Sequence, residues 1–382
     1  MVLSVLSGCG PVASPDRVTY HTDTLPNGRV HLENTGAPAW SSDERWEAEE
    51  VLRIGTLDGE GPDQFGAVSG LAVSEEGSVF VGEYYSNEIR VFTSSGSHSH
   101  TFGTQGAGPG EFNGIFGMRF AVGGELWVRD AGNNRFSVFS PDGSLVRSFS
   151  PGFFSRNTPW QLRILSGDRF LDWDIRRPHD PDAENRTDLV YFPVISPFDL
   201  SFRDTLPPIV SRMEMIDGMR VPKPFSASLE YFVDESGVIW LGNSTEYRII
   251  RRGLDGDTTL IFTLPWEPET VSEQEKIDLV DGWLPGRKIP AGQILEEKPV
   301  LARIIADDRG HVLVFPHLNG VSPGTAVDVF TEAGVFLGRV ALPVPLDLRP
   351  EPICQGGKLF GITRDDLDVP VMVQEKLDFS GV

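Results

Sequence analysis

A short phrase rich in glycine occurs twice in this chain, with the two copies 47 residues apart. The first copy is Gly59-Glu-Gly-Pro-Asp-Gln-Phe65, and the second is Gly106-Ala-Gly-Pro-Gly-Glu-Phe112. The same offset, without a gap, pairs Gly77 with Gly124, Phe80 with Trp127, Val81 with Val128, Phe92 with Phe139 and Gly96 with Gly143. A period between about 40 and 50 residues with several short strands per unit is typical of a β-propeller blade. The repeat therefore predicts the architecture, but it does not indicate a catalytic or binding activity.

Six such units can be placed along the chain. The first two span residues 65–103 and 112–150, and each shows four short stretches in which apolar and polar residues alternate, the pattern of half-buried strands. Four less regular units follow at about 153–209, 210–265, 300–342 and 343–378. The last unit contains only three predicted strands.

The stretch 46–55 supplies the missing strand. It leads into the first glycine phrase just as residues 100–103 lead into the second, which is the place of a blade's outermost strand, yet no unit precedes it. Pairing this strand with the last unit would close the ring and remove an exposed sheet edge. We therefore predict an all-β chain, a six-bladed β-propeller with an N-terminal strand closing the last blade.

Three segments organise the chain. Residues 1–16 are interpreted as a truncated lipoprotein signal and tether, residues 17–45 as an N-terminal β extension around the turn Pro26-Asn27-Gly28, and residues 46–382 as the propeller. One short helical insertion interrupts the propeller at about 267–299, where Ser272 and Glu275 have the spacing of a capping box. This insertion is either a lid or an interaction helix, or it packs against the propeller without a function of its own.

The first residues suggest a lipid anchor. Leu6-Ser7-Gly8-Cys9 resembles the lipobox of bacterial lipoproteins, in which the cysteine is acylated after cleavage. The segment lacks a basic start and is shorter than a signal peptide, which a start codon placed too far downstream would explain. A chance match of four residues is the alternative. The resemblance implies lipidation of Cys9 and a location in the cell envelope, periplasmic or extracellular.

Charge restricts the partners. The 382 residues include 55 acidic and 33 basic side chains, a formal net charge of −22. A field of this sign repels phosphate backbones, so we expect no nucleic-acid partner and no membrane contact other than through the N-terminal lipid. We expect a monomer. The two cysteines exclude a disulfide framework.

The second unit carries a family resemblance. The phrase at 106–112, followed by Gly-Glu-Leu-Trp-Val-Arg-Asp130 and Asn133-Asn134-Arg135, resembles the NHL-repeat signature, and the chain is similar to bacterial six-bladed β-propeller lipoproteins of unassigned function. In such repeats the residues that match Asp130 and Arg135 are mainly structural. Glu83 and Glu88 stand at these positions in the first unit.

Ligands of propellers bind where the innermost strands converge. Aligning those strands by the glycine that follows places Arg119 and Arg163 in one register, and Glu230 and Arg303 in a register two residues earlier. Arginines near one axis of an acidic protein suit a carboxylate or an anionic sugar. We therefore predict these four residues as the ligand-binding candidates at the tunnel mouth. Pairing with acids of the blade loops, or the lining of a wet tunnel, is the alternative.

No coherent catalytic or metal-binding set is recognisable. Gluconolactonase-type propellers hold a divalent cation with Glu, Asn and Asp, but Glu230 is the only acid found on the predicted inner strands. Acidic pairs such as Asp365-Asp366 leave calcium as an alternative to the expectation of no cofactor. We therefore expect a non-catalytic, lipid-anchored propeller that binds a protein or a small anionic ligand. A metal-dependent hydrolase or lyase with its site at the central tunnel is the alternative.

Overall fold

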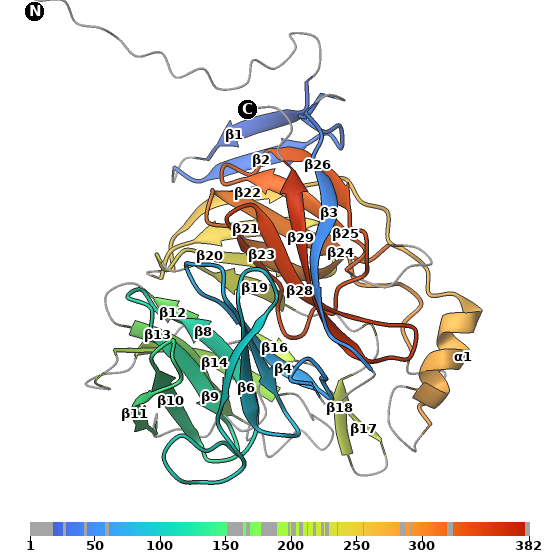
Figure 1. Cartoon of the computed structure of the whole chain (residues 1–382). Helices are drawn as coiled ribbons and strands as arrows, with labels where there is room; N and C mark the ends of the chain where they lie inside the picture. Colours follow the sequence, from blue (N-terminus) through green and yellow to red (C-terminus); the bar gives the residue numbers. More distant parts are fainter. Residues whose placement is uncertain are drawn as a thin grey trace, which may run out of the picture.

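The computed structural model describes residues 18–378, apart from 26–27, 42–43, 58–60, 151–162, 166–168, 177–188, 198, 200–203, 206–208, 212, 217–218, 223–224, 226–228, 235, 255, 283–287, 291, 293 and 319–323. Cys9 and the predicted tether therefore lie outside the described residues. Within them the chain forms seven sheets, of which six are arranged as the blades of a propeller and the seventh is a two-stranded hairpin (Figure 1).

Each of the first three blades is built from consecutive strands, as the repeat predicts. Blade one contains β4 (Val68–Val73), β5 (Val79–Glu83), β6 (Glu88–Phe92) and β7 (His98–Phe102). Blade two contains β8 (Ile115–Phe120), β9 (Leu126–Asp130), β10 (Arg135–Phe139) and β11 (Leu145–Phe149). Blade three contains β12 (Arg163–Leu165), β13 (Arg169–Arg176) and β14 (Leu189–Pro197), and its outer edge is shared by β15 (Asp204–Thr205) and β16 (Ile209–Ser211).

The other three blades complete the ring. Blade four contains β19 (Leu229–Val233), β20 (Ile239–Asn243), β21 (Arg248–Arg252) and β22 (Thr258–Thr263). Blade five contains β23 (Leu301–Ala306), β24 (His311–Pro316), β25 (Ala326–Thr331) and β26 (Phe336–Ala341). Blade six contains β27 (Ile353–Gln355), β28 (Lys358–Arg364) and β29 (Pro370–Asp378), and its fourth strand is β3 (Glu47–Ile54).

The closing strand is confirmed. β3 pairs antiparallel with β29 from Met372 opposite Ile54 to Asp378 opposite Glu47, so the two ends of the propeller sequence share one sheet. Figure 1 shows the blue β3 beside the red β29. The amide of Gln355 also donates to the carbonyl of Ser74 at 3.1 Å, which joins blade six to blade one.

The N-terminal extension is a hairpin, as predicted, but it does not stand apart from the propeller. β1 (Tyr20–Thr24) pairs with β2 (Val30–Asn34), and β2 pairs in parallel with β22. Blade four thereby becomes a six-stranded sheet. The extension is thus fixed to the outer edge of a blade far from it in sequence.

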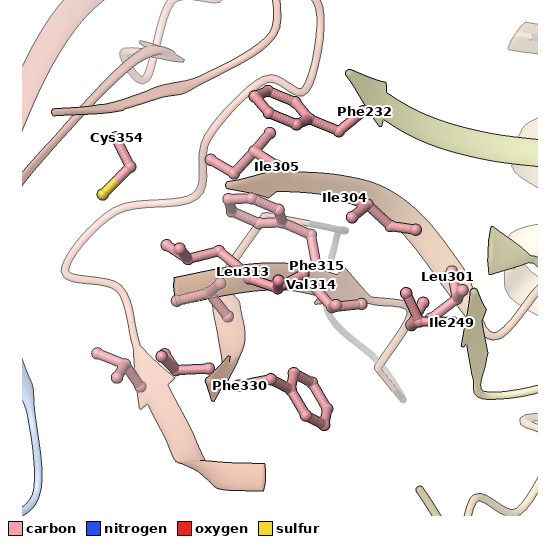
Figure 2. Packing of buried hydrophobic residues seen from close by; sticks show 14 of the residues in the cluster. Phe232, Ile249, Leu301, Ile304, Ile305, Leu313, Val314, Phe315, Phe330 and Cys354 are labelled. Atoms are coloured by element: carbon pink, nitrogen blue, oxygen red, sulfur yellow. The ribbon is translucent and has the colours of Figure 1, made fainter. Parts of the chain in front are cut away.

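Hydrophobic clusters lie between neighbouring blades all the way round the ring. Separate clusters join blades one and two, two and three, three and four, and six and one, and the largest spans blades four to six. Figure 2 shows the part of the largest cluster around Phe232, Ile305 and Phe315, with Cys354 nearby. Phe65 and Phe112, which end the two glycine phrases, are buried in the clusters before and after blade one. The repeated phrase therefore places a ring in each crevice between blades.

The repeated glycines have a backbone reason. Gly77 and Gly124 both have a φ of 83°, and Gly96 and Gly143 both have a φ of 85°. These values lie in the left-handed region, which glycine occupies without the steric cost that a Cβ imposes. Each glycine ends a tight turn between two strands of a blade, so the repeat preserves turn geometry.

The two faces of the propeller differ. Because the strands of a blade are antiparallel, the connections from second to third strand and from blade to blade emerge on one face, and the remaining turns emerge on the other. The two longest connections between blades, at 205–229 and 263–301, both belong to the first face. We call it the loop face. It also carries the hairpin of β17 (Met213–Ile216) and β18 (Met219–Pro222).

The predicted helix within 267–299 is confirmed as α1 (Glu273–Gly282), which projects beside the propeller in Figure 1. Its capping box is formed, because the Ser272 amide donates to Glu275 Oε2 at 2.9 Å and the Glu275 amide donates to Ser272 Oγ at 3.2 Å. Lys298 also contacts the helix, because its Nζ forms an ion pair with Oε1 of Glu275 at 2.6 Å. Burial opposes ionisation of Glu275, but hydrogen bonds from Lys298 and Ser272 outweigh it and lower its pKa to about 2. None of the helices in the described residues is long and apolar enough to cross a membrane.

Candidate functional site

The four residues predicted for the axis lie on the innermost strands of four blades. Arg119 belongs to β8, Arg163 to β12, Glu230 to β19 and Arg303 to β23. Arg163 begins its strand, and Glu230 and Arg303 are the second and third residues of theirs. Since inner strands begin at the loop face, these three side chains start near that end of the axis.

A carboxylate from the sixth blade joins two of the arginines. Glu351 lies in the connection that leads into β27, and its Oε1 accepts from Nη2 of Arg163 at 2.5 Å. Its Oε1 also accepts from Nη2 of Arg119 at 3.4 Å. The Arg163 guanidinium further lies over the ring of Phe232, 4.8 Å from its centroid. Residues from blades two, three, four and six therefore meet at the axis.

The other two predicted residues form a second pair. Glu230 Oε2 lies 3.5 Å from Nη1 of Arg303. Burial raises the pKa of Tyr231 well above its usual value, and the charges of Arg163, Glu351, Arg303 and Glu230 all act on this phenol. Tyr231 thus lies within reach of both ion pairs and stays uncharged. We call these residues and Arg119 the axial network.

The axial network compensates most of its own charge. It contains three arginines and two glutamates. The side chains of Arg163 and Arg303 are only 4% and 7% exposed. Arg119 is 20% exposed, so it is the most accessible cation of the three. Arg119 and Arg163 pair with an acid of a blade connection, the arrangement named in the alternative interpretation of the sequence, whereas Arg303 pairs with Glu230 of an inner strand.

Glu351 was missed by the sequence reasoning, which found Glu230 as the only acid on the inner strands. It precedes the short β27 by two residues and follows a long irregular connection, so no strand register pointed to it. The sequence feature that could have identified Glu351 is its position just before the inner strand of the last blade. Its side chain is 2% exposed, which such a carboxylate tolerates because two arginines neutralise it.

A patch of aromatic side chains lies on the loop face beside blades one and two. Tyr84 and Tyr85 are in the connection from β5 to β6, and Phe116 is near the start of β8. The Tyr84 ring lies 5.7 Å from that of Tyr85 and 5.5 Å from that of Phe116, centroid to centroid. The exposed fractions are 40%, 72% and 37% in the order Tyr84, Tyr85 and Phe116. We call this set the aromatic patch. The sequence analysis did not identify it.

The residues of the NHL-like signature have a structural role here. Asp130 accepts from the Asn113 amide at 2.8 Å, from Asn133 at 2.7 Å and from Nε of Arg135 at 2.9 Å. Arg135 then donates to the carbonyls of the second glycine phrase, at Ala107, Gly108 and Glu111. Both side chains therefore hold the connection between blades one and two.

Blade one performs the same task with different residues. Glu83 takes the place of Asp130 and accepts from the amides of Gly66, Ala67, Tyr85 and Ser86. Arg90, and not the residue aligned with Arg135, donates to the carbonyls of Pro62 and Gln64. The arginine has moved by two positions along the strand, which keeps it on the same face of the sheet.

The histidines are dispersed over the structure. His98 and His100 lie on β7, and His21 and His31 lie in the N-terminal hairpin. His311 begins β24, and His317 directly follows it. His179 falls outside the described residues. Among the residues that the structure describes, no three or more His, Cys, Asp or Glu side chains are grouped so that they could hold a metal ion. Asp365 accepts from the amides of Leu367 and Val369, as an acid of a tight turn does.

Cys354 lies on the inner strand β27, and it is buried. Burial raises the pKa of its thiol well above the usual value. This thiol is therefore protonated at neutral pH, and it packs as a small apolar group.

Comparison with known proteins supports the fold. No protein-family model and no curated protein matches the chain. A "Putative exported protein" from Bacteroides fragilis superposes with a TM-score of 0.53 at 11% identity, covering 91% of this chain and 99% of that one. A member of the DUF4221 family from Bacteroides vulgatus also gives 0.53 at 11% identity, covering 88% and 99%.

Virginiamycin B lyase from Staphylococcus aureus is a weaker match, with a TM-score of 0.45 at 11% identity over 87% of this chain and all of that one. This likeness is too weak to carry an argument. Together with the sheet topology, the first two similarities establish the chain as a six-bladed β-propeller.

Proposed function

We propose that this protein is a non-catalytic binding propeller of the bacterial cell envelope, anchored by a lipid on Cys9. Its loop face would receive a partner protein or a small anionic ligand. Support for the envelope comes from the lipobox-like segment at 6–9 and from the similar protein of Bacteroides fragilis, which is named as an exported protein. The net charge of −22 disfavours nucleic acid as the partner.

The aromatic patch is the observation that carries the binding role. Exposed tyrosine and phenylalanine side chains that contact one another supply large contact area at a small entropic cost, and they are enriched in binding interfaces. The patch lies on the loop face, from which the long connections of this propeller emerge. Arg119 would supply the accessible positive charge for an anionic group bound at the nearby axis. The catalytic alternative has no observation of this kind in its favour.

Site-specific photo-cross-linking in living cells tests this proposal. Tyr85, which is 72% exposed, is replaced by the photo-reactive p-benzoylphenylalanine. The control places the same group at Val122, which is 71% exposed on the opposite face. We expect a discrete adduct from position 85 only, and we expect Tyr84→Ser in the same chain to weaken it. No adduct, or the same adducts from both positions, contradicts binding through the loop face.

A further inference from the structure

A pocket of about 640 Å³ lies at the outer rim of the propeller, between blades four and five and under the N-terminal extension. We call it the rim pocket. Its lining comes from the extension, from the segment after β22 and from β26, and comprises Gly36, Pro38, Trp40, Ser41, Arg45, Leu264, Pro265, Trp266, Phe336, Gly338 and Arg339. Pockets that hold small ligands usually have volumes between about 300 and 1,000 Å³. The rim pocket is far from the axial network in the fold, because the outer strands build it.

The extension is held firmly where it forms the pocket wall. Asn34 is 4% exposed, and its amide group donates to the carbonyls of Thr263 at 2.9 Å and Gly334 at 3.0 Å. Its Oδ1 accepts from the Phe336 amide at 2.8 Å. One side chain thus fixes the extension to both blades. The pocket is therefore a built feature of the fold.

The next residues of the extension follow the edge strand of blade five. The amides of Ala39 and Trp40 donate to the carbonyls of Phe336 and Leu337, each at 3.0 Å. A Cβ atom on Gly338 would approach the Trp40 ring to 2.5 Å, so this glycine allows the indole to lie against the strand. Trp40 also stacks near Trp46, with ring centroids 4.9 Å apart. The Trp40 ring is thereby positioned as a wall of the pocket.

Arg339 lines this pocket, and its guanidinium is held by contacts on other sides. Its Nε and Nη2 donate to the two oxygens of Asp328 at 2.6 and 2.8 Å, and its Cζ lies 5.3 Å from the centroid of Trp266. Asp328 is fully buried and also accepts from the hydroxyl of Tyr247 at 2.7 Å. These contacts orient the guanidinium and leave Nη1, which has no hydrogen-bond partner among the described residues, as a donor for a ligand. Arg339 is 37% exposed, consistent with a group that faces the pocket.

The lining is chemically distinctive for this protein. It contains Arg45 and Arg339 but no acidic residue, although the chain has 55 acids against 33 bases. Trp40, Trp266 and Phe336 supply flat apolar walls. Guanidinium groups donate only and match carboxylate oxygens well, while aromatic faces pack against flat rings.

We propose that the rim pocket is a second binding site, for a small carboxylate with a flat face, the chemistry of a uronic acid or of an aromatic acid. The carboxylate contacts Nη1 of Arg339 and the Arg45 side chain, and the ring lies against Trp40 and Trp266. This site does not depend on the loop face, so either assignment can fail without the other.

Titration calorimetry with D-glucuronate and with benzoate tests the proposal, and D-glucose and benzyl alcohol serve as the uncharged matches. We expect at least one carboxylate to bind, with its uncharged match at least about tenfold weaker. Glucuronate alone would indicate a sugar acid, and benzoate alone an aromatic acid. Binding should also quench tryptophan fluorescence, because two indoles line the pocket.

Variants locate the bound probe. Arg45→Glu reverses an exposed charge, and Trp40→Ala removes a wall; each should weaken binding by about tenfold or more. Arg309→Glu makes the same charge change on an exposed turn outside the pocket and should leave binding unchanged. The melting temperature of each variant verifies folding. Binding of neither carboxylate at about 10 mM, equal binding of the uncharged matches, or binding unaffected by both pocket variants overturns the proposal.

Discussion

Arg163 and Glu351 form a buried ion pair across the propeller, with Nη2 of the arginine 2.5 Å from a carboxylate oxygen of the glutamate. They are 188 residues apart in sequence and belong to blade three and to the connection into blade six. Arg119 of blade two shares the same carboxylate. One glutamate thus links blades that have no sheet hydrogen bonds in common.

Removing this carboxylate should be costly. In Glu351→Gln the Arg163 guanidinium stays buried without its counter-charge, and breaking a buried pair on one side typically costs about 3–5 kcal/mol. We expect a decrease of that order in the free energy of unfolding, measured by urea denaturation. The double variant Arg163→Met with Glu351→Met should recover part of the loss, because the most deeply buried guanidinium is removed together with its partner and only Arg119, which is 20% exposed, loses a counter-charge. A loss below about 1 kcal/mol in Glu351→Gln would mean that the pair is not the link described here.

Arg135 should matter far more than the exposed Arg364, which pairs with Asp347 and Asp368. It holds Asp130 and three carbonyls of the second glycine phrase. Arg135→Ala should therefore lower the free energy of unfolding by about 3 kcal/mol, since hydrogen bonds to charged groups contribute about 1.5–3 kcal/mol. The control Arg364→Ala removes a side chain that is 45% exposed and should cost about 1 kcal/mol or less. If Arg135→Ala and Arg364→Ala lower the free energy of unfolding by equal amounts in thermal and urea denaturation, the structural role of Arg135 is contradicted.

The first repeat shows how far the sequence predicts such contacts. The offset of 47 residues aligns Glu88 with Arg135, yet Arg90 makes the equivalent contacts. The repeat predicts the strands, their turns and the carbonyls of the glycine phrase that accept hydrogen bonds, because these depend on local sequence patterns. It did not fix which position of the strand supplies the arginine, because a long side chain reaches the same carbonyls from either of two positions on one face.

The axial network shows a second limit of sequence reasoning. The periodicity placed Arg119, Arg163, Glu230 and Arg303 on inner strands, since strand register is a local property. Their pairing depends on how the blades are arranged around the axis and on Glu351, which lies in an irregular connection. The rim pocket could not be predicted from the sequence for a related reason. The parallel docking of β2 on β22 joins segments about 230 residues apart that share no sequence pattern.

Glu375 should make stability depend on pH. It is fully buried on β29, and burial, followed by the nearby charge of Glu50, raises its pKa to about 7, although the backbone of Val344 opposes the shift. Between pH 4.5, the usual pKa of the group, and about pH 7, the folded state holds a proton that the unfolded state has lost. Stability therefore falls as pH rises through this range, by about 3 kcal/mol at 1.36 kcal/mol per unit of pKa.

The variant Glu375→Gln isolates this effect. Relative to the wild type, it should gain up to about 3 kcal/mol between about pH 4.5 and pH 8, measured by urea denaturation across that range. The control Glu76→Gln makes the same change at an exposed position and should show no such gain. If the difference between Glu375→Gln and the wild type stays constant with pH, the carboxyl of Glu375 does not titrate as described.

Lipidation of Cys9 can be separated from every property of the propeller, because the only other cysteine is buried. Cells that make the protein are fractionated with a detergent that separates into two phases on warming, and the wild type should enter the detergent phase. Cys9→Ser should shift the protein to the aqueous phase without changing its melting temperature, since residue 9 lies before the first strand of the extension. Cys354→Ala should remain in the detergent phase, because a thiol that is 6% exposed is not accessible to an acylating enzyme. A wild type found wholly in the aqueous phase, or a Cys9→Ser variant that still enters the detergent, would show that the lipobox-like segment is a chance match.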